Sequence, residues 1–413
     1  MRMREEPEWL RKFRERALSL IDKLPEPKYG ARIDLEALSV ERELREYDES
    51  SPVVSKALKR LHFTMKEERP FLLQVNDFLR KKYAERLSQL GILAEDIDTA
   101  VRKYEWLKDY WFKAFPMALN KLTAFHAAYS RGGFVLRVKE GVKLKEPIQM
   151  CFIVSSSSYA QLPHNIIIAE PYSEVHILTG CIAPRGTRYS LHSGLTEVYV
   201  GEGARVFSIM IEIWPEYVHA RPLKAVKVDK GGTYIGSVIV LEPGASYQAF
   251  PTAILMGDMS SVTAKTVVTA RGNSEVDVGE AAFLLGRECR AILVTRAVAF
   301  DSATVKERIR ARGRGWRSKA YLECSGLILG DRAKIFAVPE LEAISKDVEL
   351  YHESSIGRVG ENELMYLMSR GFEEDEAISM MIRGFLDPGL SDLPAPLRIQ
   401  VESILERVAI EGL

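Results

Sequence analysis

The sequence predicts a mainly β protein in which a β-solenoid lies between two helical parts. Short apolar runs separated by small turn residues fill the middle of the chain, and apolar positions recur there at a near-constant step. Helical periodicity is confined to the two ends. We therefore expect a helical N-terminal domain over residues 1–130, a β core over 131–348 and a helical C-terminal domain over 349–413.

The N-terminal part has the apolar spacing of helices. Apolar residues recur at three- and four-residue steps from Trp9 to Leu24, which predicts a helix that stops at Pro25. A second helical stretch is predicted over about 77–110 from a similar stripe, formed by Leu79, Tyr83, Leu87 and Leu90.

The middle of the chain predicts stacked β coils. The apolar strand positions that follow successive turns are Val276, Ile292, Val305, Tyr321 and Ile335, so longer and shorter steps of similar size alternate. Short strands and tight turns at so even a step are typical of a solenoid. A large β-sandwich is the competing interpretation, because the period alone does not exclude it.

The C-terminal part returns to helical patterns. Helices are predicted over 361–369, 373–382 and about 397–410, and Gly371 is placed to cap the first of them. Methionine-rich helices form adaptable docking faces, whereas a helical cap on the end of a solenoid needs no partner. The pattern alone leaves both interpretations open.

Composition excludes several classes of protein. The 413 residues carry 57 basic and 57 acidic side chains, so the net charge is zero and a nucleic-acid coat or an anionic membrane is not the expected partner. No stretch approaches the roughly 18 consecutive apolar residues of a membrane helix, and the charged start is unlike a secretory signal. The basic run 306–319 is interpreted as a solvated strand face. Four widely spaced cysteines indicate a reduced compartment, so we expect a cytoplasmic protein.

The sequence has no P-loop, Gly-x-Ser-x-Gly elbow, His-Glu-x-x-His pair or dinucleotide fingerprint, so the usual enzyme classes have no support. The residues that remain as candidates are soft or borderline metal ligands. Cys324 lies between two apolar strand segments and, taken alone, predicts a small buried side chain. Cys181, taken alone, also predicts a small buried side chain, although it follows a glycine, where a turn would expose its thiol. His352 and Glu353 lie at the β-to-helix boundary, where a loop would let both reach one metal ion.

The run from His352 to Pro388, which contains Arg-Gly-Phe at 383–385, closely resembles the SufB/SufD family of iron–sulfur cluster assembly scaffold proteins. The resemblance extends back through the β region to Glu6-Pro-Glu-Trp9. It implies a right-handed parallel β-helix that pairs with a second subunit, as a homodimer or with a paralogue. It also implies that the ABC-type ATPase SufC docks on the C-terminal helices, so ATP hydrolysis is expected in SufC and this chain is expected to be a scaffold.

The resemblance assigns roles to individual residues, and these lean toward SufB. Cys181 matches the cysteine that receives sulfur from a cysteine desulfurase, and Lys224 matches a lysine of the internal sulfur-transfer tunnel. Cys324, His352 and Glu353 match residues at the subunit interface that are expected to hold the iron of a transient iron–sulfur cluster. Soft thiolate combined with histidine or carboxylate suits ligation that must be reversible.

The chain also departs from the SufB pattern. Glu212-Ile-Trp214 stands in place of Gln-Asn-Trp, Glu323-Cys-Ser325 stands in place of Gln-Cys-Asp, and the extra N-terminal cysteine motif is absent. A SufD-like structural partner without its own cluster site is therefore the alternative, although it would not require Cys181 and Cys324. A β-helix enzyme acting on polysaccharide is a remote third hypothesis, because the β region lacks the grouped carboxylates that such chemistry needs.

Overall fold

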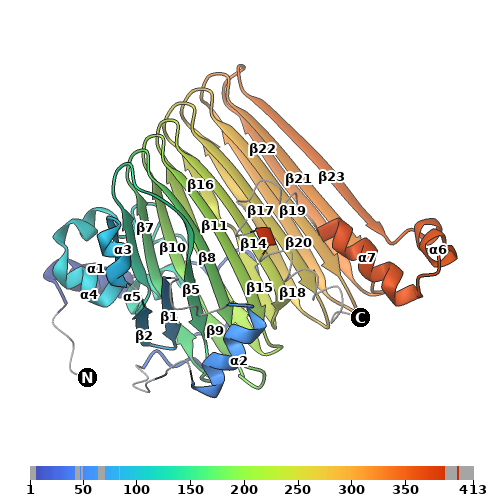
Figure 1. The fold of residues 1–413 in the computed structure, drawn as a ribbon, viewed down its shortest axis with the longest axis horizontal. Helices are drawn as coiled ribbons and strands as arrows, with labels where there is room; N and C mark the ends of the chain where they lie inside the picture. The colour runs from blue at the N-terminus through green and yellow to red at the C-terminus, as the bar shows by residue number, and fades with distance from the viewer. Residues whose placement is uncertain are drawn as a thin grey trace.

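The computed structural model describes residues 6–41, 47, 50–63, 70–82, 84–386 and 398–399. The protein is mainly β, with 45% strand and 19% helix, and its strands form a β-solenoid of about 8 turns. Figure 1 shows the strands as stacked rungs, with most of the helices at one end and α6 and α7 at the other. The predicted β-solenoid with helices at both ends is confirmed, and the sandwich alternative is wrong because neighbouring strands of successive coils pair in parallel.

The N-terminal part mixes helices and strands. Its elements are α1 (Glu8–Leu18), α2 (Pro52–Arg60), β1 (Phe71–Val75), β2 (Phe78–Lys82), α3 (Ala84–Gln89), β3 (Ile92–Asp96), α4 (Ile97–Lys103), the 3₁₀ helix η1 (Glu105–Asp109) and α5 (Lys121–Tyr129). The first predicted helix is found as α1, but it ends at Leu18 and a series of turns, rather than more helix, leads to Pro25. The single helical stretch over 77–110 is wrong. Leu79 lies on strand β2 and Leu87 on helix α3, and both pack against the same core. The prediction failed because a spacing of eight residues fits the period of a strand as well as that of a helix.

Two sheets form the walls of the solenoid. The first sheet contains β5 (Lys143–Ile153), β8 (Glu174–Ile182), β11 (Arg205–Trp214), β14 (Thr233–Pro243), β17 (Ser261–Ala270), β19 (Arg290–Ala299), β21 (Lys319–Ile328) and β23 (Glu349–Arg358), with β1 and β2 at one edge. The second contains β4 (Phe134–Val138), β7 (His164–Ala169), β10 (Leu195–Val200), β13 (Leu223–Val228), β16 (Thr252–Leu255), β18 (Glu275–Leu284), β20 (Thr304–Gly313) and β22 (Lys334–Ala343), with β3 at one edge. Four short strands, β6 (Ala160–Gln161), β9 (Ser190–His192), β12 (Val218–Ala220) and β15 (Ser246–Ala249), join the second sheet through β18.

The register explains the alternating step seen in the sequence. Val276 lies beside Val305 on the second wall, and Ile292 lies beside Tyr321 on the first. One full coil is therefore the sum of one longer and one shorter step. Each step leads from a residue on one wall to a residue on the other.

The cross-section of the solenoid changes along its length. In the early coils a short strand and a strand of the second wall are separate, and Pro163, Pro222 and Pro251 lie at the break, where a missing N–H interrupts the ladder. β15 and β16 then both pair with the single strand β18. At Gly279, within β18, the backbone has φ +149°, and an added Cβ would lie 1.4 Å from the carbonyl oxygen of Arg308. From β18 onward each coil has two strands.

The main core lies inside the solenoid, in the space we call the lumen. Side chains alternate along each strand, so one set faces the lumen and the other faces outward. In β11, Met210 and Trp214 belong to the lumen core, whereas Ile209 and Ile211 belong to an outer cluster covered by α2. This alternation fixes the direction of every functional side chain discussed below.

The C-terminal helices are α6 (Glu361–Ser369) and α7 (Glu374–Leu386), and Gly371 adopts φ +99° after α6, as expected for a cap. The predicted helix over 397–410 falls almost wholly outside the described residues. The β region extends past residue 348, because β23 pairs along its whole length with β21. The division into three domains stays a prediction. Among the described residues, no helix is both long enough and apolar enough to cross a bilayer.

Candidate functional site in the solenoid lumen

Cys181 lies in β8 and faces the lumen. Its side chain is buried, and it belongs to the lumen core beside Glu212 of the next coil. Of the two interpretations of Cys181, the buried side chain is confirmed and the exposing turn is wrong. Gly180 is part of the strand, and an added Cβ there would lie 2.7 Å from the Leu61 side chain on the outer face. The glycine therefore serves close packing rather than a turn.

Glu212 is the buried acid beside Cys181. Its Oε2 accepts a hydrogen bond of 2.5 Å from the indole N–H of Trp214, while its Oε1 has no partner among the described residues. Burial raises the pKa of Glu212 to about 8, so the carboxyl is mostly protonated at neutral pH. Burial, together with the Glu212 charge, also raises the pKa of the Cys181 thiol well above its ordinary value.

Lys224 faces the lumen from the second wall. Its Nζ donates a hydrogen bond of 3.4 Å to the hydroxyl of Tyr234, and its side chain is buried. Lys224 and Cys181 line the same small cavity of about 20 Å³, which has room for about one water molecule. His192 also lines this cavity, and burial lowers its pKa to about 3, so the imidazole is neutral. The structure thus places the predicted sulfur acceptor and the predicted tunnel lysine around one space.

Further polar side chains occupy the lumen beyond Lys224. The hydroxyl of Thr266 donates a hydrogen bond of 2.9 Å to Glu280 on the opposite wall. Burial raises the pKa of Glu280 to about 8 and raises that of Glu307, one coil further, well above its ordinary value. The second oxygen of Glu280, both oxygens of Glu307 and the hydroxyl of Thr295 have no partner among the described residues.

Sequence reasoning did not identify these acids as part of the site. A signal was present, because Glu280 interrupts the alternating apolar positions Val276, Val278, Ala282 and Leu284 that face the lumen. A carboxyl at such a position points into a core.

Cys324 completes this series of lumen side chains. Thr266, Thr295 and Cys324 lie side by side on successive strands β17, β19 and β21. The Cys324 side chain is fully buried, and burial with the nearby carboxyls of Glu307 and Glu280 raises its pKa to about 12. The thiol is therefore protonated in this state.

His352 and Glu353 lie on β23 rather than in a loop. They stand beside Leu322 and Glu323 of β21, so His352 shares the lumen face with Cys324 and Glu353 points outward. The loop arrangement predicted for this pair is wrong. Nε2 of His352 has no partner among the described residues, whereas Glu353 accepts a 2.8 Å hydrogen bond from the hydroxyl of Tyr321. Within one chain, the structure brings Cys324 and His352 to the same face and separates Glu353 from them.

Across the described part of the chain, no group of three or more His, Cys, Asp or Glu side chains is arranged to hold a metal ion. All four cysteines are free and buried.

The basic run 306–319 does not form a continuous cationic surface. Arg310 and Arg312 pair with Glu340 and Glu342 on the neighbouring strand of the next coil. Arg308 departs from the predicted solvated face, because it is buried and forms an ion pair with Asp277. Carboxylates on adjacent strands therefore neutralise much of this segment.

The chain is similar to a known family and to several known proteins. Residues 152–385 match the family described as "SUF system FeS cluster assembly, SufBD core domain". An iron–sulfur cluster assembly SufBD family protein of Methanothermobacter thermautotrophicus is 38% identical over 321 residues, which cover 77% of this chain and 78% of that protein. A SufBD family protein of Pyrococcus horikoshii is 32% identical over 99% of this chain and 94% of its own length.

The similarity reaches bacterial members as well. The iron–sulfur cluster assembly protein SufB of Bacillus subtilis is 27% identical over 98% of this chain and 90% of its own length. The match to the core domain covers more than half of the chain, and the similarity to the two archaeal relatives extends over more than two thirds of it. The chain therefore belongs to the SufBD family of iron–sulfur cluster assembly proteins.

Proposed function

We propose that this protein is a scaffold subunit that accepts sulfur and iron and assembles a transient iron–sulfur cluster at an interface with a second SufB/SufD-type subunit. The observation that carries the proposal is the lumen itself. Cys181 and Cys324 both face it, and the polar side chains of Lys224, Thr266 and Glu280 lie between them. Glu280, Thr295 and Glu307 in the same lumen carry buried polar atoms without partners among the described residues, and because such atoms are rare in proteins they support a function beyond stability.

Cys181 is the proposed entry point for sulfur from a cysteine desulfurase. In this step the thiolate of Cys181 attacks the outer sulfur of the desulfurase persulfide, forming a new S–S bond on Cys181 while the desulfurase thiolate leaves. The ammonium group of Lys224 stabilises sulfur anions of this kind beside Cys181. The direction of transfer is along the lumen toward Cys324.

Cys324 and His352 are the proposed iron ligands from this subunit. They lie next to the open end of the solenoid, where β22 and β23 leave large apolar side chains exposed, namely Phe336, Val338, Leu341, Ile344, Tyr351 and Ile356. Strand edges of this kind present unpaired backbone groups and invite pairing with another chain. A homodimer, or a heterodimer with a paralogue, would cover them. Glu353 faces outward and contributes from the rim of that interface.

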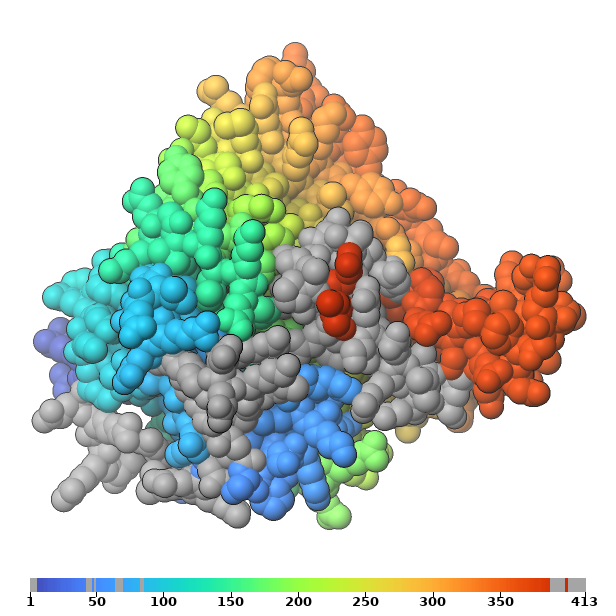
Figure 2. All heavy atoms as spheres, in the orientation of Figure 1, coloured from blue at the N-terminus to red at the C-terminus, as the bar shows by residue number. Residues whose placement is uncertain are grey.

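The C-terminal helices are the proposed docking site of SufC. α6 projects from the body of the molecule, as Figure 2 shows. Its exposed side chains include Met365, Tyr366 and Met368, which suit an adaptable protein interface. In this proposal the chain is not itself the ATPase, and it works in the cytoplasm, where reducing conditions keep its thiols free.

The test is anaerobic reconstitution with iron and sulfide, read by visible absorbance and by iron and sulfide content. Wild-type protein is expected to take up a labile cluster, and Cys324→Ser and His352→Ala are expected to lose it. Cys289→Ser is the matched control, because Cys289 is equally buried but lies in a turn, close to Ser260 and the carbonyl of Gly257. If wild-type protein binds no more iron and sulfide than an unrelated control protein, the scaffold proposal is wrong and a SufD-like structural role replaces it.

A further inference from the structure

The outer face of the first sheet carries a polar network directly behind Cys324. Cys324 points into the lumen, so its neighbours Glu323 and Ser325 point to the outer face of β21. The hydroxyl of Ser325 donates a hydrogen bond of 3.1 Å to Oε1 of Glu323. Both residues that flank Cys324 therefore belong to one hydrogen-bonded group.

Arg296 on the adjacent strand β19 holds this group. Its Nη2 and Nε lie 3.0 and 3.2 Å from Oε1 of Glu323, and the two side chains are 25% and 17% exposed. Hydrogen bonds between charged partners in such half-buried positions are roughly twice as strong as neutral ones. Glu323 is thus held from two sides, by Arg296 and by Ser325.

The same guanidinium also holds helix α7. Nη1 of Arg296 donates a hydrogen bond of 3.0 Å to the main-chain carbonyl of Phe385, in the last turn of the helix. The final carbonyls of a helix lack partners within the helix and carry its negative end, so a cation from another element is a favourable cap. Arg296 is therefore a single side chain that contacts both α7 and the strand of Cys324.

Apolar packing seats α7 beside this network. Ile382 and Leu386 of the helix are buried against Val298 and Phe300, which lie at and just after the C-terminal end of β19. Leu327 of β21 packs against the same cluster. Because this cluster is small, its apolar contacts alone hold α7 only weakly on the sheet. The hydrogen bond from Arg296 to the Phe385 carbonyl adds a contact of defined direction.

We propose that Arg296 is a positioning residue through which displacement of α7 alters the β21 segment 323–325 and opens access to Cys324. The inference rests on the proposed function, in which a partner docks on α6 and α7. When α7 leaves its seat, Arg296 loses the Phe385 carbonyl and Glu323 loses a fixed counter-charge. The segment 323–325 of β21 then relaxes. On the side away from β19, this segment pairs with β23, the exposed last strand of the sheet.

Glu323 and Ser325 are the two positions at which the sequence departs from the Gln-Cys-Asp pattern of SufB. A neutral glutamine in place of Glu323 would not form an ion pair with Arg296. The departure around the assembly cysteine is thus accompanied by a contact that ties this cysteine to the C-terminal helix.

The test is a double-substitution cycle on the full chain, read by amide hydrogen exchange of residues 323–325 and by alkylation of Cys324 measured on its peptide. Arg296→Ala removes the contact, and Ile382→Asp displaces α7 by placing a charge in its buried seat. Each single change is expected to raise exchange and alkylation at least about tenfold, the effect of losing one charge-assisted hydrogen bond. The double variant is expected to rise no further than the larger single effect, because both changes break the same connection.

Additive effects, or no change at Cys324 on displacing α7, would overturn the proposal. Arg271→Ala is the matched control, because its guanidinium lies 3.7 Å from the ring of Phe300 in the same cluster, whereas the hydrogen bonds of Glu323 described above come from Arg296 and Ser325. Arg271→Ala is expected to leave the amide exchange rates of residues 323–325 within about twofold of the wild-type rates. Arg296→Lys keeps the charge but cannot reach both partners with a planar fork, and is expected to resemble Arg296→Ala.

Cluster reconstitution separates this inference from the proposed function. Arg296→Ala is expected to take up iron and sulfide as wild-type protein does when no partner is docked on α6 and α7, because the ligands remain. If wild-type protein takes up no cluster while the exchange cycle is non-additive, the scaffold role is wrong and the coupling stands. If the cluster forms and the cycle is additive, the coupling is wrong and the scaffold role stands.

Discussion

The two ends of the solenoid are built in opposite ways. At the N-terminal end, β2 and β3 pair antiparallel with β1 and β4, and helices cover the adjacent coils, so that every residue of β7 is buried. At the C-terminal end, β22 and β23 have almost no buried residues, and no further coil covers them within the described part of the chain. Antiparallel strands and helices end a parallel ladder within the chain, whereas an uncovered parallel edge presents unpaired N–H and C=O groups with which another chain can pair. The cysteine nearest the uncovered end is Cys324.

The largest expected effect comes from removing one aromatic ring at each end. Phe152→Ala in the closed part empties a fully packed lumen position and is expected to reduce the free energy of unfolding by about 3–5 kcal/mol. Phe336→Ala at the open end removes a half-exposed ring and is expected to change it by less than about 0.5 kcal/mol. Urea unfolding of the two variants, at a protein concentration at which the subunits are separate, checks this, and equal costs would mean that the open end is covered within the chain.

A charge at the uncovered edge is expected to act on assembly rather than on folding. Ile356→Lys places a lysine on β23 and is expected to weaken subunit pairing at least about tenfold while leaving the monomer folded. Sedimentation velocity at several concentrations measures this. Ile292→Lys is the control, because Ile292 is similarly exposed on the outer face of β19, away from the end. A dimer that survives Ile356→Lys would place the interface elsewhere.

The lumen acids predict how stability depends on pH. Burial raises the pKa of Glu280 from 4.5 to about 8, so between these values the folded protein retains a proton that the unfolded chain releases. The free energy of unfolding therefore falls as pH rises through this window, by at most about 1.4 kcal/mol for each pH unit from this group.

Glu280→Gln removes this contribution and is expected to make the decrease between pH 5 and pH 8 shallower, measured by urea unfolding at several pH values. Glu212 and Glu307, whose pKa values burial also raises, account for the remaining decrease. Glu275→Gln, at the exposed start of the same strand, is the control and is expected to leave the slope unchanged. A slope in Glu280→Gln as steep as that of wild-type protein would assign the pH dependence to other groups.

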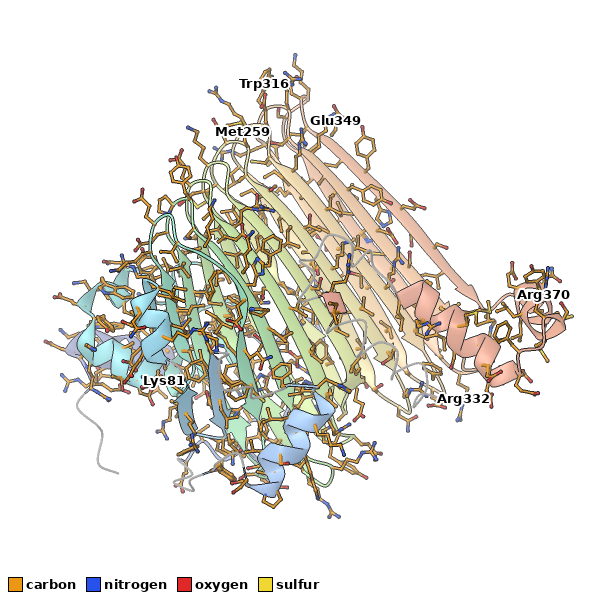
Figure 3. The ribbon with its side chains drawn as sticks, viewed as in Figure 1. Lys81, Met259, Trp316, Arg332, Glu349 and Arg370 are labelled. Carbon is orange, nitrogen blue, oxygen red and sulfur yellow. The ribbon has the colours of Figure 1, made fainter. Side chains whose placement is uncertain are left out.

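The smallest effect concerns the turns between the two walls. One turn position adopts positive φ in successive coils, with glycine at Gly203 and Gly231 but with side chains at Met259, Glu288 and Arg317. Figure 3 shows Met259 and Trp316 along this row of turns, with Arg332 at the opposite edge. Met259→Gly is expected to stabilise the protein by a few tenths of a kcal/mol to about 1 kcal/mol, by relieving the left-handed backbone of a non-glycine residue. Thermal unfolding measures this, and destabilisation would show that the Met259 side chain contributes packing.

Much of the fold follows from patterns that the sequence displays openly. The steps between Val276, Ile292 and Val305 predict stacked coils because every coil places the same kind of residue beside the one before. The pattern fails where short elements alternate. Leu79 and Leu87 share a spacing that suits both helix and strand, and only pairing of β2 with β1 decides between them.

The site was predictable in its residues but less so in its geometry. The resemblance to SufB/SufD identified Cys181, Lys224 and Cys324, and the structure aims all three into the lumen. It did not reveal that His352 and Glu353 point to opposite sides, because that depends on β23 continuing past residue 348. Arg296 could not be connected with Cys324 from the sequence, since the contact arises only where two coils and a helix meet.

The coil repeat sets the distance along the solenoid axis between the thiols of Cys181 and Cys324. Cys181 lies on β8 and Cys324 on β21, and the strands of the first sheet between them follow in the order β8-β11-β14-β17-β19-β21. At about 4.8 Å for each strand-to-strand step, the separation along the solenoid axis is roughly 24 Å. Insertions in the turns leave this length unchanged, and only the gain or loss of a whole coil alters it. Any relative that keeps both thiols must therefore keep their spacing to a whole number of rungs.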